Sequence, residues 1–123
     1  MNIKIISPIL GFESVKEVMF LEIDDFFSSI SGENLSFTLI DPTRLRDYSF
    51  KIPSSYQSLL QIEDKDDIKI YSVVVINSEI EKSTINFIAP IVINFSKALL
   101  AQITLDSFKY PDFQILDPIS NYL

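Results

Sequence analysis

The feature that most constrains this chain is residues 83–105, STINFIAPIVINFSKALLAQITL, a long apolar segment rich in β-branched and aromatic side chains. Apolar residues recur in it at a spacing of two, at Ile85, Phe87, Ile91, Ile93 and Phe95. That spacing puts side chains on one face of an extended strand. The segment therefore predicts strands with this face buried, and with Asn86 and Asn94 on an opposite face that is open to water.

Pro90 divides this segment into two runs, residues 85–88 and 91–95. Proline has no backbone N–H to donate to a sheet, so it predicts a bulge or bend between the runs. A tight turn is predicted near Ser96 and Lys97, followed by a strand at residues 99–105. Together these features predict bent, paired strands that close a sheet.

Further runs of Ile, Val, Phe and Leu predict strands at residues 18–23, 35–40 and 68–76. The last run is apolar on both faces over residues 73–76, which indicates a strand covered by a second layer. The predicted fold is therefore all-β and mainly antiparallel: a small barrel-like or sandwich domain with one or two short helices.

One helix is expected after Pro53, because Ser54 and Gln57 have the spacing of a capping box. Its apolar residues Leu59, Leu60 and Ile62 would close one end of the core. With 123 residues and no linker or repeat, the chain is expected to form a single domain, residues 1–123. Residues 114–123 lack a clear period and are interpreted as a C-terminal tail or docked extension.

Composition excludes several kinds of function. The chain has no histidine and no cysteine, which excludes disulfides, thiolate nucleophiles, Ser-His-Asp catalysis and the usual zinc site. Seventeen acidic and ten basic residues give a pI near 4.4, which argues against direct binding to nucleic acid and favours a basic partner. No segment is long and apolar enough to span or bind a membrane, so we expect a cytoplasmic protein without a cofactor.

The densest charge is EDKDD, with the acidic residues Glu63, Asp64, Asp66 and Asp67. Three interpretations are open: a solvated turn between helix and strand, an electrostatic contact for a basic partner, or a metal site. The ligand spacing and glycine of an EF-hand are absent. Asp41 and Pro42 are typical of a turn, and a carboxylate without a second acid or base is a poor catalyst. Aromatic residues such as Phe26 that prove exposed would form an interaction patch.

Several short motifs occur in one order along the chain: PILGF at residues 8–12, Asp41-Pro42 after an apolar run, YSFKIP at 48–53, and STINFIAPIVIN at 83–94, followed by Gln102. Together they resemble the flagellar assembly factor FliW, from about Pro8 to Phe113. The residues that match the family pattern are expected to maintain the fold: Gly11, Phe12, Asp41, Pro42, Asn86, Pro90 and Asn94.

The resemblance implies a non-enzymatic regulator with an all-β, barrel-like fold. Proteins of this family bind CsrA, a basic, RNA-binding translational regulator, and relieve its repression of flagellin synthesis. They also bind flagellin, which draws them away from CsrA. Both proteins are therefore the expected partners.

Charge and expected exposure place these partners on the chain. We predict that CsrA meets the acidic residues Glu63, Asp64, Asp66 and Asp67, and that flagellin meets a groove near Ile88, Pro90 and Phe95. The alternative function is a small-molecule-binding β-barrel, since about eight strands can enclose one small ligand. An enzyme ranks third, because no catalytic set of residues is evident.

Overall fold

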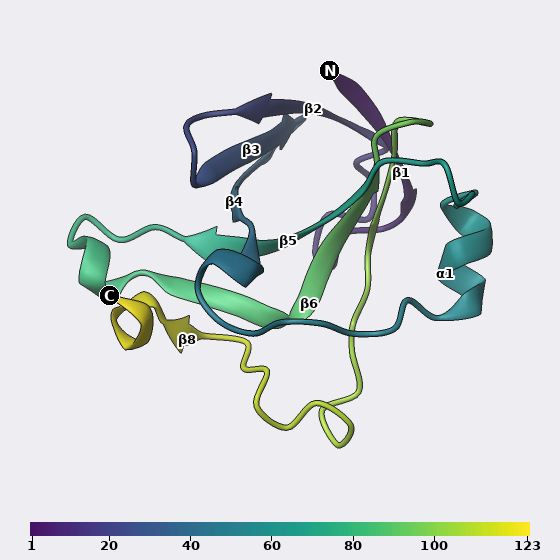
Figure 1. Cartoon of the computed structure of the whole chain (residues 1–123). Helices are drawn as coiled ribbons and strands as arrows, with labels where there is room; N and C mark the ends of the chain where they lie inside the picture. Colours follow the sequence, from purple (N-terminus) through teal and green to yellow (C-terminus); the bar gives the residue numbers. More distant parts are fainter.

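A computed structural model describes all residues, 1–123, as one strand-rich body (Figure 1). The strands are β1 (Asn2–Ser7), β2 (Glu17–Glu22), β3 (Phe27–Gly32), β4 (Leu35–Ile40), β5 (Ile68–Val75), β6 (Thr84–Asn94), β7 (Leu99–Gln102) and β8 (Asp117–Pro118). One α-helix, α1 (Ser54–Leu59), and three 3₁₀ turns, η1 (Pro42–Arg44), η2 (Ile80–Lys82) and η3 (Ile119–Tyr122), complete the elements. The α-helix has only six residues, and none of the helical segments could span a lipid bilayer.

The first seven strands close into a barrel. Neighbouring strands pair in the order β1-β2-β3-β4-β5-β6-β7, all antiparallel, and β7 returns to pair with β1 in parallel. The short strand β8 adds to β6 outside this ring. The predicted all-β, mainly antiparallel fold is confirmed, and of the two predicted architectures the chain forms the barrel.

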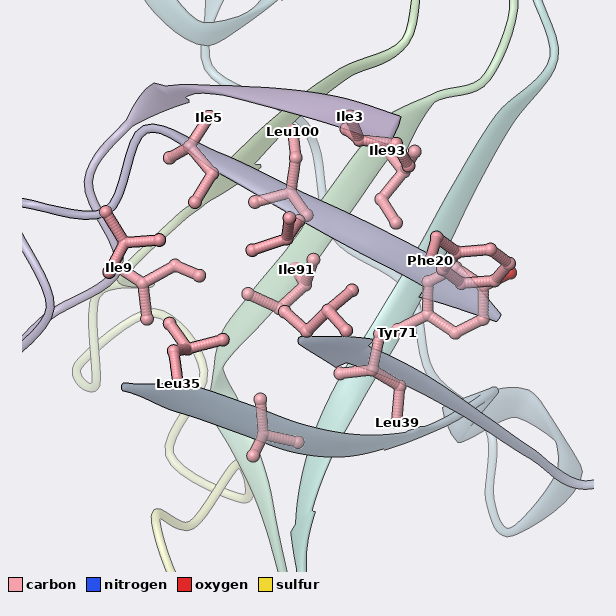
Figure 2. Packing of buried hydrophobic residues seen from close by; sticks show 14 residues of the cluster. Ile3, Ile5, Ile9, Phe20, Leu35, Leu39, Tyr71, Ile91, Ile93 and Leu100 are labelled. Atoms are coloured by element: carbon pink, nitrogen blue, oxygen red, sulfur yellow. The ribbon is translucent and has the colours of Figure 1, made fainter. Parts of the chain in front are cut away.

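Large apolar side chains fill the inside of the barrel. Figure 2 shows the side chains of this cluster converging from all sides of the ring. The cluster contains Ile3, Ile5, Ile9, Val15, Val18, Phe20, Ile30, Leu35, Leu39, Tyr71, Val73, Ile91, Ile93 and Leu100. Burying each such side chain stabilises the fold by about 1.5–3 kcal/mol. The interior is thus a packed core.

Strand β6 is buried on both faces, which explains why the segment that contains it is so apolar. Its second face lies under the connection between β4 and β5, which includes α1, and under the C-terminal segment (Figure 1). The prediction that Asn86 and Asn94 lie on a wetted face is wrong, because Asn94 is fully buried and Asn86 is half-buried. Periodicity alone could not reveal the covering layer.

The bend predicted at Pro90 is present. Asn86 of β6 lies opposite Val73 of β5, but Ile91 lies opposite Tyr71, so four residues of β6 face a single residue of β5. The side chain of Asn86 accepts a hydrogen bond from the N–H of Ala89 at 3.1 Å and stabilises this bulge. β6 continues through the bulge as one strand.

The tight turn predicted near Ser96 and Lys97 is also present, at residues 95–98 between β6 and β7. Ala98 adopts φ of +54° there, in the left-handed region that glycine adopts more readily. The following strand is shorter than predicted, because β7 ends at Gln102. Beyond it, the N–H groups of Ile103 and Leu105 donate to carbonyl groups of the bulged part of β6.

The helix begins one residue earlier than a capping box at Ser54 requires, because Ser54 is its first residue and not its N-cap. Pro53 is the N-cap and no side chain caps the helix, whereas Gln57 donates from Nε2 to the carbonyl oxygen of Ile52 at 2.7 Å. Leu60 is fully buried as predicted, but Leu59 is about half exposed. The prediction of a covered end for β5 is likewise wrong at Val75 and Ile76, which extend beyond the barrel and are exposed.

Three strands of the structure, β1, β3 and β8, lie outside the predicted strand ranges. β1 and β3 lack a long apolar run, yet both are needed to close the ring. The C-terminal segment pairs through β8 with β6 and buries Ile119 against the barrel (Figure 1). Its carboxylate Asp117 accepts hydrogen bonds from the side chains of Asn121 and Tyr122.

Candidate functional site

The acidic loop, residues 63–67, lies between α1 and β5. Glu63, Asp64 and Asp67 are exposed, whereas the side chain of Asp66 is only 2% exposed. The structure therefore places three of the four predicted CsrA-binding carboxylates at the surface and turns the fourth inward.

Asp66 connects the acidic loop to the turn between β6 and β7. Its Oδ2 accepts hydrogen bonds from Nζ of Lys97 at 2.7 Å, from Nδ2 of Asn94 at 2.9 Å and from the N–H of Glu63 at 3.0 Å. Hydrogen bonds from these donors favour the charged form of the carboxylate over the neutral form. Together they lower the pKa of Asp66 to about 2, and the bond from Lys97 contributes most. Asn94 also donates to the carbonyl oxygen of Leu60 at 2.9 Å, so the loop is anchored at both ends.

Lys97 partly neutralises the loop. Its Nζ lies 3.3 Å from Oε2 of Glu63 and donates to the carbonyl oxygen of Gln61, and hydrogen bonding to Asp66 raises its pKa. Lys65 makes a longer, exposed pair with Glu63 at 3.6 Å. Asp64 and Asp67 have no ion pair, so their charges are the ones that remain available to a partner.

The residues predicted to form a groove for flagellin are not brought together at the surface. Ile88 and Pro90 are buried beneath the layer that covers β6. Phe95 is half-buried and packs edge-on against Phe20, with ring centroids 5.0 Å apart. In this conformation the three residues form no exposed groove.

The family-pattern residues make contacts within the chain. Oδ1 of Asp41 accepts hydrogen bonds from the N–H and hydroxyl of Thr43, at 2.9 and 2.6 Å, and so begins η1 with Pro42 as its first residue. Gly11 adopts φ of +87° in the loop after β1, and Phe12 packs edge-on against Phe37 at 5.4 Å.

Gln102 joins two of the sequence motifs. Its Oε1 accepts a hydrogen bond from the N–H of Leu10 at 2.9 Å, and its Nε2 donates to the carbonyl oxygen of Ala89 at 3.2 Å. The loop that contains PILGF is thereby connected to the bulge of β6.

Sequence reasoning missed a cleft of about 530 Å³ at one end of the barrel, where β2 and β4 end and β3 and β5 begin. Acidic side chains line it: Glu22, Asp24, Asp25 and Asp41. Arg44 and Lys69 also line it, and Phe26, 55% exposed, lies at its edge. We call this the barrel-end cleft.

None of the four carboxylates in the barrel-end cleft makes an ion pair, since every salt bridge of the structure lies elsewhere. The two cations interact with aromatic rings instead. The guanidinium of Arg44 lies 5.1 Å from the ring centre of Phe26, and Nζ of Lys69 lies 5.7 Å from that of Phe95. Four carboxylates against these two cations leave the lining of the cleft with a net charge of −2.

Two hydroxyl groups also line the barrel-end cleft. Ser28 and Tyr71 are each only 8% exposed, and neither hydroxyl makes a hydrogen bond within the chain. Both hydroxyl oxygens keep some contact with solvent, since the only solvent-excluded side-chain polar atom without a partner is Oγ of Ser72. Burial first of all, together with the negative charges of Glu22, Asp41 and Asp67, raises the pKa of Tyr71 to about 12. Asp67 of the acidic loop thus lies close enough to the cleft for its charge to act on the Tyr71 hydroxyl.

Comparison with known proteins gives consistent matches over nearly the whole chain. The family model described as FliW protein matches residues 1–116. The protein called flagellar assembly factor FliW in Campylobacter lari is 39% identical over 127 residues, which cover 100% of this chain and 97% of that protein. Flagellar assembly factor FliW 1 of Wolinella succinogenes is 41% identical over 120 residues, covering 95% and 94% of the two chains.

A solved structure shares the fold. The crystal structure of a flagellar assembly factor FliW superposes with a TM-score of 0.84 at 24% sequence identity, covering 96% of this chain and 84% of the other. At this identity the likeness supports the barrel architecture alone.

Proposed function

The chain belongs to the FliW family of flagellar assembly factors, and from that membership we propose that it regulates flagellar assembly by binding CsrA and flagellin in turn. Binding to CsrA would relieve the repression of flagellin synthesis, and free flagellin would draw the protein away from CsrA. The full-length similarity to named flagellar assembly factors is the observation that carries the regulatory role.

Charge supports a basic partner such as CsrA. The chain has a net charge of −7, and the unpaired carboxylates Asp64 and Asp67 stand beside Glu63 on the acidic loop. A basic protein would be steered to this surface, which raises the rate of association. In this proposal Asp66 positions the loop and does not touch the partner, because its carboxylate is already hydrogen-bonded to Lys97 and Asn94.

The geometry bears on how flagellin could compete with CsrA. A standard interface buries about 800 Å² on each partner, whereas this protein exposes 7217 Å². Two separate sites would therefore fit, and exclusion requires overlapping or coupled footprints. A flagellin site at Ile88 and Pro90 would require the layer over β6 to move, since both residues are buried.

Action by binding alone is part of the proposal. The chain has no histidine or cysteine that could serve as a catalytic base or nucleophile. The exchange would take place in the cytoplasm, where CsrA controls translation. The packed barrel interior gives no support to the alternative of a small-molecule-binding barrel.

The test is calorimetric titration of this protein with CsrA of the same organism, repeated after saturation with its flagellin. Tight binding that flagellin abolishes is the expected result. The double variant Asp64→Asn/Asp67→Asn should bind CsrA more weakly, whereas Glu81→Gln, a neutralisation on the exposed turn η2, should bind like the unchanged protein. Absence of any binding to CsrA would refute the proposed exchange.

A further inference from the structure

The barrel-end cleft combines carboxylates that make no ion pair with the hydroxyl groups of two largely buried residues, Ser28 and Tyr71, which have no partner in the chain. We propose that it receives one cationic side chain, a lysine or an arginine, presented by the basic protein partner. The inference deepens the proposed function and rests on it for the identity of that partner. The cleft, rather than the acidic loop alone, then determines where the partner docks.

The charge in the cleft selects a cation. The carboxylates of Glu22 and Asp25 make no hydrogen bond or ion pair, while Asp24 uses Oδ1 to accept from the N–H groups of Phe26 and Phe27, each at 2.8 Å. An anionic ligand would be repelled. Arg44 and Lys69 offset only two of the four carboxylates and make no ion pair with them, because both lie over aromatic rings.

The hydroxyl groups of Ser28 and Tyr71 point to a ligand with hydrogen-bond donors. Neither hydroxyl has a partner in the chain, and both oxygens stay open to solvent in the cleft, so a ligand can replace water as their hydrogen-bond partner. A hydroxyl oxygen accepts from an ammonium or guanidinium N–H. A cation that enters the cleft would therefore satisfy both the carboxylates and the hydroxyls.

The arrangement suits a side chain better than a metal ion. Nowhere in the chain do three or more carboxylates come together closely enough to hold a metal ion. A guanidinium presents five N–H donors over a wider area, and a lysine or arginine has an apolar stem. Phe26 at the edge of the cleft offers an apolar surface to that stem. The volume of about 530 Å³ lies within the range of sites that hold small ligands.

The first experiment uses a small probe and does not depend on CsrA. The ¹⁵N-labelled protein is titrated with N-acetyl-arginine amide and, in parallel, with N-acetyl-citrulline amide, which has a similar shape and no charge. The arginine compound should shift the amide signals of Ser28 and Tyr71 in a saturable way, and the citrulline compound should not. Equal responses to both compounds, or no response to either, would overturn the proposal.

Variants locate the effect. The double variant Glu22→Gln/Asp25→Asn should lose the response to the arginine compound. Glu33→Gln removes the same kind of charge from the exposed turn between β3 and β4, at the other end of these strands, and should retain it. If both proteins respond alike, the cleft is not the binding site.

The second experiment measures binding to CsrA by calorimetry. The double variant should bind at least about tenfold more weakly, and Tyr71→Phe, which removes only the hydroxyl, severalfold more weakly. Glu33→Gln should match the unchanged protein. CsrA binding that is equal for all four proteins refutes the cleft as its docking site and leaves the proposed function intact. If CsrA binds none of them, the proposed function fails, and the arginine titration alone decides whether the cleft binds cations.

Discussion

The carboxylate of Asp66 lies 2.7 Å from Nζ of Lys97, although the two residues are 31 positions apart in the chain. This pair holds the acidic loop against the turn between β6 and β7, with Asn94 as a second donor at 2.9 Å. The loop is thereby kept in one shape while its other carboxylates face solvent. A charge that a partner could have used is instead part of the scaffold.

Stability should depend on acid through Asp66. The hydrogen bonds from Lys97, Asn94 and Glu63 lower its pKa from an ordinary 3.8 to about 2. The carboxylate therefore contributes stability that is present above about pH 4 and is lost as the pH falls toward 2. Urea unfolding is measured at pH 7, 4 and 2.5. Asp66→Asn should be less stable than the unchanged protein at pH 7, and its free energy of unfolding should fall less as the pH is lowered. The matched control Asp64→Asn, in which an exposed and unpaired carboxylate is removed, should keep the full loss. If the two variants have the same pH profile, this role of Asp66 is wrong.

Tyr48 should support the bulge of β6 through its hydroxyl group. That hydroxyl donates to the carbonyl oxygen of Phe87 at 2.7 Å in a buried setting, and its pKa is raised chiefly by burial. Tyr48→Phe leaves the carbonyl group without this donor and should lower the free energy of unfolding by about 1–3 kcal/mol. Tyr110→Phe is the control, because its hydroxyl accepts only one long, exposed hydrogen bond from Lys51 at 3.4 Å. Equal urea midpoints for the two variants would contradict this account.

Ala98 should be a site where glycine stabilises the fold. Its φ of +54° costs an alanine about 1–2 kcal/mol, whereas glycine adds roughly 0.5–1 kcal/mol of backbone entropy loss. Ala98→Gly should therefore raise the free energy of unfolding by up to about 1 kcal/mol. The comparison variant Ala101→Gly, in the buried strand β7, should be destabilised. A loss of stability in Ala98→Gly would show that the left-handed conformation is not strained.

Local patterns predicted much of the barrel wall. β4 has the predicted bounds, 35–40, because a residue that interrupts the strand stands on each side of its apolar run. Asn34 before it adopts φ of +57°, and Asp41 after it begins η1. β3 was missed because its sequence, FSSISG, has serines at both inward and outward positions. Closure of the ring by the parallel pair of β1 and β7 is a non-local event that no window of sequence contains.

The candidate site was predictable only in part, for a related reason. The acidic loop is contiguous in sequence, so its charge could be seen at once. The inward turn of Asp66 depends on Asn94 and Lys97, which come from a distant hairpin. The barrel-end cleft takes its carboxylates from the ends of different strands, so only the fold brings Glu22 and Asp41 together.

The barrel interior should behave as a packed core and not as a ligand cavity. Ile91 is fully buried at the centre of the interior cluster (Figure 2), so Ile91→Ala should cost roughly 2–5 kcal/mol of unfolding free energy. Leu21→Ala, at a 54% exposed position of β2, should change it by less than about 0.5 kcal/mol. An interior built around a small molecule would leave room beside Ile91, and truncation there would then cost little in the ligand-free protein. Urea unfolding of both variants therefore distinguishes the two barrels: similar small losses would revive the small-molecule-binding alternative, and a large loss confined to Ile91→Ala would exclude it.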